Sequence, residues 1–235
     1  VVSYQTAWLK YYYPVEFMAA LMTSVIDNPG KVSEYILTCR QMGIQILPPD
    51  INEGESGFSV SGNAIRYGLS AIKSVGKPVT EVILAERERN GPFRSMEDFV
   101  GRMSMKEVNK RTLENFIKSG ALDTLPGTRR QKMAVAPTML EEKAREKKSM
   151  FEGQLSLFDI AGEEDRNEFQ ITFPDVGEYS KDELLAFEKE ILGVYISGHP
   201  LDDYEDTWRR NITATSAQFI VDEETDEAGV EDGSR

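Results

Sequence analysis

Cysteine and histidine are almost absent from this chain. Cys39 is the only cysteine and His199 the only histidine among 235 residues. A disulfide needs two cysteines, and a zinc site of the usual kind needs several cysteine or histidine ligands, so neither can form within the chain. This composition suits a reducing compartment and predicts a cytoplasmic protein. No hydrophobic run approaches the length that crosses a bilayer, so we expect no membrane partner.

The chain also lacks an initiator methionine and a charged-then-apolar leader. It runs from Val1 directly into residues with helical character. We therefore expect an internal segment of a longer protein.

Basic residues are outnumbered overall, but not in every region. The formal net charge is −13, yet residues 1–135 contain 17 basic and 14 acidic side chains, whereas residues 136–235 contain 10 and 26. Within residues 61–135 the basic side chains number 14 and the acidic ones 8. The sequence thus predicts that contacts with phosphate, if any, lie in the middle of the chain and not in its acidic final third.

Apolar periodicity and capping residues predict a mainly α-helical fold. Helices are expected at residues 3–12, 14–26, 29–42, 69–75, 78–90, 96–103, 108–119, 129–148 and 181–192. A short strand is expected at residues 44–47, and a β-hairpin from residues 58–60 and 65–67. Cys39 falls on an apolar helix face and is predicted to be a core residue. The acidic part is expected to be largely extended, with one or two helices.

One candidate site lies where a glycine separates two helical stretches. Ile72, Lys73, Ser74, Val75, Gly76 and Lys77 form this break. Such a turn exposes backbone N–H groups that can bind an anion, and the two lysines add positive charge. The stretch resembles a helix-hairpin-helix motif, which grips a duplex phosphate without reading sequence. The usual motif has glycine at the position of Ser74. Lys110 and Arg111 occupy the equivalent place in a looser second copy, and an ordinary helical corner is the alternative.

A second candidate is an apolar pentapeptide within a run of charged residues. It consists of Gln154, Leu155, Ser156, Leu157 and Phe158. The pattern resembles the peptide by which bacterial DNA polymerases and repair proteins bind the sliding clamp. Its leucine and phenylalanine would enter an apolar pocket, and the glutamine amide would bond at the rim. A short core strand is the alternative, although the charged flanks favour an exposed peptide.

The order of these motifs resembles one family, the alpha subunit of bacterial DNA polymerase III. The matching blocks are VSYQTAWLK at residues 2–10, Pro14 with EFMAA at 16–20, MGI at 42–44, LPPDIN at 47–52, GL at 68–69, AIK at 71–73, NKR at 109–111, KSGA at 118–121 and SGHPL at 197–201. Tyr12 departs from the pattern, because the family commonly has histidine there. A nucleotide role for that turn is therefore left unassigned.

The resemblance implies a division of the chain into four parts. Residues 1–55 would end the polymerase fingers, and residues 56–125 would form a tandem helix-hairpin-helix module that binds duplex DNA. Residues 126–180 would be a helix and linker that carries the clamp-binding peptide at 153–160. Residues 181–235 would be a helical connector and acidic tail that leads to an oligonucleotide-binding barrel.

The resemblance also implies template-directed DNA synthesis by nucleotidyl transfer, with the sliding clamp and other replisome subunits as partners. The family performs this reaction with Mg²⁺ ions held by paired aspartates. No Asp-x-Asp occurs in this sequence, so the segment is expected to bind no cofactor and to be inactive alone. The runner-up is a stand-alone adaptor or repair scaffold that binds DNA and clamp without catalysis. We assign no chemistry to His199, to Asp202 or to Asp203.

Overall fold

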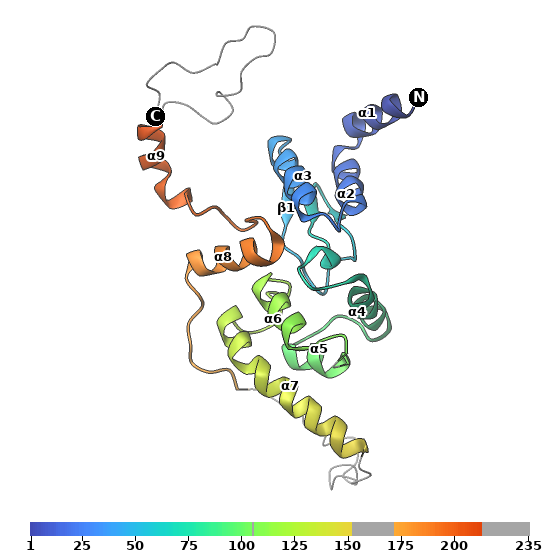
Figure 1. Cartoon of the computed structure of the whole chain (residues 1–235), viewed down its shortest axis with the longest axis vertical. Helices are drawn as coiled ribbons and strands as arrows, with labels where there is room; N and C mark the ends of the chain where they lie inside the picture. Colours follow the sequence, from blue (N-terminus) through green and yellow to red (C-terminus); the bar gives the residue numbers. More distant parts are fainter. Residues whose placement is uncertain (105, 152–171, 213–235) are drawn as a thin grey trace. The chain divides into compact units, whose positions relative to one another are not determined.

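The computed structural model describes residues 1–104, 106–151 and 172–212. These residues fall into two compact units, Val1–Ser197 and Gly198–Arg235. Helices dominate both, as the sequence predicts, and Figure 1 shows their order along the chain. None of the helices in these residues is long and apolar enough to cross a membrane.

The first unit begins with three helices, α1 (Val2–Tyr12), α2 (Pro14–Ser24) and α3 (Pro29–Gln41). Asn28 caps α3 as predicted, because its side chain accepts a hydrogen bond from the amide of Lys31 at 3.2 Å. Cys39 is fully buried in the core, which confirms its predicted place. Burial raises the pKa of the Cys39 thiol to about 11, so the thiolate needed for nucleophilic chemistry is disfavoured.

A three-stranded sheet follows, with β1 (Gln45–Leu47), β2 (Ser59–Ser61) and β3 (Ala64–Arg66) in the order β1-β3-β2. The predicted hairpin is confirmed: β2 and β3 are antiparallel and Val60 faces Ile65. Gly62 turns it with a φ of 61°. The parallel pairing of β1 with β3 joins Ile46 to Ile65 and was not evident from the sequence.

The helices after the sheet are η1 (Leu69–Ala71), α4 (Lys77–Asn90), α5 (Met96–Arg102), α6 (Lys110–Lys118) and α7 (Arg129–Phe151). The prediction of a helix at residues 69–75 was wrong. Only one 3-10 turn forms there, because Ile72 is extended and Ser74 has a φ of 64°, and neither conformation continues a helix.

Arg102 joins α4 to α5 through contacts with several groups. Its guanidinium donates to the Glu86 carboxylate, to the Glu86 carbonyl oxygen and to the Gly91 carbonyl oxygen, each at 2.9 Å. It also lies 4.3 Å from the centre of the Phe93 ring. A planar guanidinium with several fixed donors suits this place. Arg102 therefore links the end of α4 and the following turn to α5.

The chain then returns along the module, and we call residues 172–197 the return segment. It contains α8 (Lys181–Leu192), which begins at the predicted capping box of Ser180 and Glu183 and stops at Gly193 in the left-handed conformation. Figure 1 shows α8 beside α6, and Lys118 on α6 pairs with Glu190 on α8 at 3.0 Å. Apolar residues of α8 complete the same core that begins in α2.

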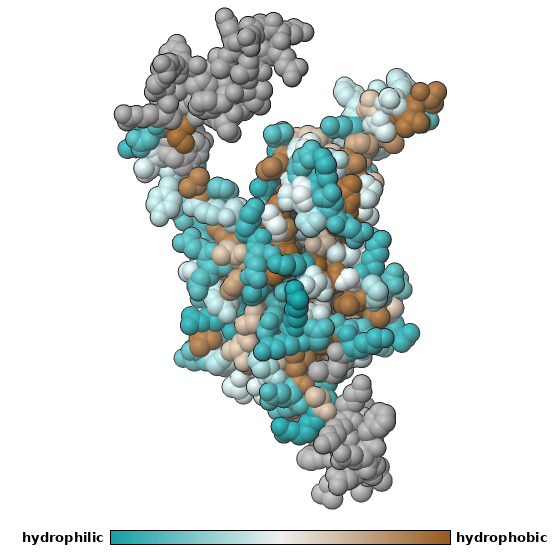
Figure 2. All heavy atoms as spheres, in the orientation of Figure 1, coloured by the Kyte–Doolittle hydropathy of each residue, from teal (hydrophilic) through white to brown (hydrophobic). Residues whose placement is uncertain are grey.

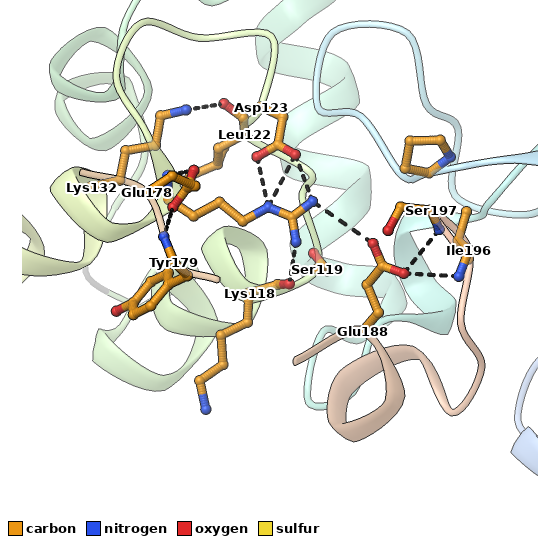
Figure 3. Close-up of polar contacts among 12 residues, drawn as sticks. Lys118, Ser119, Leu122, Asp123, Lys132, Glu178, Tyr179, Glu188, Ile196 and Ser197 are labelled. Atoms are coloured by element: carbon orange, nitrogen blue, oxygen red, sulfur yellow. Dashed lines mark hydrogen bonds and ion pairs between the residues drawn. The ribbon is translucent and has the colours of Figure 1, made fainter. Parts of the chain in front are cut away.

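Polar contacts fasten the return segment to the start of α7 (Figure 3). The Glu178 carboxylate accepts hydrogen bonds from the amides of Arg129 at 2.8 Å and Arg130 at 3.1 Å. It thus caps α7 from a position far along the chain. Arg129 in turn binds Asp123, with one pair of atoms 2.6 Å apart.

A second carboxylate holds the end of the return segment. The buried Glu188 accepts hydrogen bonds from the amides of Ile196 at 2.8 Å and Ser197 at 3.0 Å.

Lys132 is a fully buried lysine next to this network, and Figure 3 shows its amine bonded near Leu122. Its ammonium donates to the carbonyl oxygens of Leu122 at 2.7 Å and Leu125 at 2.8 Å. Burial lowers the pKa of Lys132, because the charged form is disfavoured away from water. The amine satisfies two carbonyl oxygens in the turn between α6 and α7, so it stabilises the end of the module.

The second unit is small within the described residues and contains η4 (Asp202–Tyr204) and α9 (Glu205–Asn211). His199 lies in the predicted turn. Its amide donates to the Asp202 carboxylate at 2.6 Å, and its Nδ1 accepts from the amide of Leu201 at 3.2 Å. The imidazole is thus a local hydrogen-bond partner of its own turn.

Glu178 makes the stability of the first unit depend on pH. Partial burial acts to raise the pKa of Glu178, but hydrogen bonds from the amides of Tyr179, Arg129 and Arg130 outweigh it and lower the pKa. A carboxylate whose pKa is lower in the folded state stabilises the fold above its unfolded pKa of about 4.3. That stability is lost as the pH falls through the folded pKa.

We predict that Glu178→Gln lowers the free energy of unfolding by about 1 kcal/mol at pH 7, the usual value of a helix cap. The difference from wild type should shrink as the pH falls below about 4. Urea denaturation between pH 7 and pH 3.5 measures it. Asp175→Asn, an exposed carboxylate in the same segment, is the matched control and should change little. A difference that stays constant with pH would contradict the capping role.

Candidate nucleic-acid interface

The candidate turn at residues 72–77 is built by a change of backbone direction between η1 and α4. Ile72 is extended after η1, Ser74 takes the left-handed conformation, and Gly76 is the N-cap of α4. Lys77 is the first residue of α4, and Pro78 follows in the first turn, where a missing N–H is harmless. Left-handed backbone is rare for residues other than glycine. Ser74 therefore adopts the conformation that glycine supplies in the usual motif.

Three backbone amides of this turn have no acceptor in the part of the chain that the structure describes. They belong to Ser74, Gly76 and Lys77. The amide of Val75 differs, because it donates to the carbonyl oxygen of Ile72 at 3.0 Å. Amides that find no acceptor inside the protein are available to an external anion, and those at the start of α4 also feel the positive end of the helix dipole.

The side chains around the turn divide into exposed and buried. Lys73, Ser74, Gly76 and Lys77 are exposed to solvent. Val75 is only 3% exposed and packs in the hydrophobic core. Val75 thus differs from its neighbours, because its side chain lies in the core and its amide is already bonded. Its predicted contact with DNA stays a prediction. The remaining residues form what we call the amide turn, comprising Lys73, Ser74, Gly76 and Lys77.

Two distant elements hold the amide turn in place. The amide of Lys73 donates to the carbonyl oxygen of Ile191 at the end of α8, at 3.2 Å. The carbonyl oxygen of Lys73 accepts from the side-chain amide of Asn115 on α6, at 2.6 Å. Asn115 is 7% exposed. Sequence reasoning missed Asn115. The one available signal was a polar residue between the apolar positions of a short helix.

The predicted second copy of the motif falls between α5 and α6. Its N-cap, Asn109, accepts the amide of Thr112 at 3.1 Å, so one donor at the start of α6 is already occupied. Lys110 and Arg111 are exposed, as a role in binding phosphate requires. Lys110 lies 4.0 Å from the Glu114 carboxylate. Arg111 is one helical turn before Asn115 and so lies on the same side of α6 as the amide turn.

The predicted clamp-binding residues Gln154, Leu155, Ser156, Leu157 and Phe158 lie outside the described residues. The described chain ends before them in α7, and resumes after them at residue 172. Their role stays a prediction from the sequence.

The described residues contain no group of three or more histidine, cysteine, aspartate or glutamate side chains arranged to hold a metal ion.

Comparison with known proteins agrees with the geometry. The family described as helix-hairpin-helix motif matches residues 43–132, which include the amide turn and the second copy. The DNA polymerase III subunit alpha of Borreliella burgdorferi is 42% identical over 205 residues. That of Deinococcus radiodurans is 43% identical over 205 residues, and that of Thermus aquaticus 42% over 207 residues.

The matched region is a large share of this chain and a small share of each relative. It covers 87% of the chain in all three comparisons. It covers 18%, 15% and 16% of the three relatives, in the same order. The chain thus spans less than a fifth of the length of these relatives. On this similarity, and with a helix-hairpin-helix motif at residues 43–132, the chain belongs to the family of DNA polymerase III alpha subunits.

Proposed function

We propose that this segment binds duplex DNA for a replicative DNA polymerase and that the amide turn is its main phosphate contact. One observation carries the proposal: the turn from Lys73 to Lys77 has an exposed lysine at each end and three backbone amides with no acceptor among the described residues, and it lies within the match to the helix-hairpin-helix motif. A phosphate oxygen can accept from the amides while Lys73 and Lys77 supply charge.

Binding of this kind does not depend on base sequence. Backbone amides and lysines meet phosphate oxygens, which are the same at every nucleotide, and no base edge is read. Such contacts suit a polymerase, which has to hold any product duplex. They should also weaken with salt, because each neutralised phosphate releases counterions.

Arg111 is proposed as an additional contact, with Lys110 as a weaker one. Arg111 is exposed on the side of α6 that carries Asn115, so it can approach a backbone that lies on the amide turn. Lys110 is near Glu114, and that carboxylate offsets part of its charge. The second copy therefore assists the first.

Catalysis is assigned to other parts of such a polymerase. The relatives' names attribute DNA synthesis to the whole alpha subunit, of which this chain matches less than a fifth. The sequence has no Asp-x-Asp pair to hold Mg²⁺. We propose that the segment supports processivity, whereas the nucleotidyl transfer and its Mg²⁺ ions belong to the complete enzyme. Other replisome subunits and a cytoplasmic setting remain part of this proposal.

Residues 154–158 are proposed to bind the sliding clamp. The support is their composition: two leucines and a phenylalanine with a leading glutamine, between strongly charged flanks. The peptide comes after the helix-hairpin-helix region in sequence. A chain that binds both DNA and clamp would remain on its template for longer, because each contact raises the effective concentration of the other.

We predict that Lys73→Ala and Lys77→Ala each weaken duplex binding equally on unrelated DNA sequences. Each should lower the slope of log affinity against log salt by about 1, because one phosphate contact is lost. Fluorescence anisotropy over a salt series measures both effects. Lys31→Ala is the matched control, since Lys31 is exposed on α3 and pairs with Glu34 at 2.7 Å. An unchanged slope in both variants would show that these lysines do not contact phosphate.

We predict that replacing Leu157 and Phe158 with alanine weakens clamp binding by about thirtyfold or more, as expected for two central anchor residues. DNA affinity should not change, because the peptide lies outside the basic region. Surface plasmon resonance on immobilised bacterial sliding clamp measures the first effect, and anisotropy the second. Alanine at Phe169 and Ile171, two apolar residues of the same stretch, is the control. Equal clamp affinity of the double variant and wild type would refute the assignment.

A further inference from the structure

Asn115 is a buried polar residue whose partner lies in the amide turn. Its side chain is on α6, the last helix of the second helix-hairpin-helix copy, and it donates to the carbonyl oxygen of Lys73 at 2.6 Å. A buried amide needs a hydrogen-bond partner. The partner of Asn115 is the Lys73 carbonyl oxygen, which belongs to the same peptide unit as the N–H of Ser74.

The geometry of that peptide unit determines where the Ser74 amide points. A trans peptide is planar, and its C=O and N–H bonds point in opposite directions. The Lys73 carbonyl points toward Asn115 on α6. The N–H of Ser74 therefore points away from α6, and it has no acceptor among the described residues. Asn115 thus sets the direction of one of the three amides offered to phosphate.

The backbone at Ser74 needs such support. Its φ is 64°, in the left-handed region, which disfavours residues with a Cβ atom and persists only where surrounding contacts hold it. One contact is the bond from Asn115. The other is the bond from the Lys73 amide to the Ile191 carbonyl oxygen at 3.2 Å. Both polar groups of Lys73, directly before the unfavourable residue, are therefore held from outside the turn.

We propose that Asn115 is a positioning residue for phosphate binding: its bond to the Lys73 carbonyl keeps Ser74 left-handed and directs the Ser74 amide toward the DNA. This inference rests on the proposed DNA-binding function. The second copy of the motif then has a role besides its own lysine and arginine, since its last helix sets the shape of the first copy's turn.

The test uses the whole 235-residue chain with Asn115→Leu, which keeps the side-chain volume similar and removes the donor. Asn115→Asp, which keeps the shape and removes the donor, is measured in parallel. Duplex affinity should fall by about tenfold, the usual value of one hydrogen bond between well-placed groups. The NMR signal of the Ser74 amide should shift in the free protein and respond less to added duplex. Urea denaturation confirms that both variants are folded under the binding conditions.

Ser119→Ala is the matched control, because it also removes a buried polar group near the end of α6. Ser119 is fully buried, and its hydroxyl donates to the Phe116 carbonyl oxygen at 3.0 Å, without contact to the amide turn. Its removal should leave duplex affinity and the Ser74 signal unchanged. A loss of affinity equal to that of the Asn115 variants would mean that Asn115 acts only through general stability.

A double-mutant cycle with Ser74→Gly tests whether Asn115 acts by holding the Ser74 backbone or only by packing in the core. Glycine adopts the left-handed conformation without strain, so the turn should depend less on Asn115 when glycine is present. We expect Asn115→Leu to cost about tenfold in affinity with Ser74 and about threefold or less with Gly at position 74. An equal loss in both backgrounds would overturn the inference.

The failures of the two proposals can be told apart. If the wild-type chain does not bind duplex, the proposed function fails and the inference fails with it. If the wild type binds duplex with lysine-dependent salt slopes, but the Asn115 variants bind equally well and the Ser74 signal does not move, only the positioning role is overturned.

Discussion

A backbone amide can bind an external anion only if no carbonyl oxygen of the protein reaches it first. In the amide turn this condition depends on the peptide unit between Lys73 and Ser74, because its orientation decides whether the Ser74 amide faces inward or outward. The bond from Asn115 and the bond to Ile191 hold that unit from two sides. Packing of α6 and α8 therefore determines the geometry of the amide turn, although the turn itself lies on neither helix.

The return segment contributes to the structure that supports the amide turn. Glu178 caps α7, and Glu188 accepts two amides close to the end of the first unit. The Lys118–Glu190 ion pair and the shared hydrophobic core hold α8 against α6. The end of α8 supplies the carbonyl oxygen that holds Lys73. An acidic part of the sequence that was expected to be a linker is thus packed into the first unit, although its charge would disfavour direct contact with phosphate.

The basic side chains of the first unit fall into two groups: some are exposed to solvent, and others form hydrogen bonds within the protein. Lys73, Lys77 and Arg111 are exposed and can meet phosphate. Arg102, by contrast, directs its donors at groups of α4 and α5, and the buried Lys132 satisfies two carbonyl oxygens. A count of basic residues in the sequence includes both kinds. Only the exposed kind contributes to an electrostatic footprint for DNA, so the local charge count overstates the binding surface.

The sequence by itself determined most helix boundaries, the hairpin around Gly62 and the location of the candidate turn. These features follow from residues a few positions apart: Asn28 caps the helix that begins beside it, and Ser180 and Glu183 form their own capping box. The expected division at residues 55, 125 and 180 concerns function and stays a prediction, while one hydrophobic core runs across all three positions.

Only the tertiary structure decided which groups reach one another across long stretches of chain. The partner of Lys73 is 42 positions away in Asn115, and the cap of α7 is 49 positions beyond Arg129. No local pattern marks such pairs, because they depend on how helices pack. The same holds for Val75, whose place in the turn suggested contact with DNA and whose apolar side chain enters the core. Local propensity placed the turn, and packing decided which of its amides remain available.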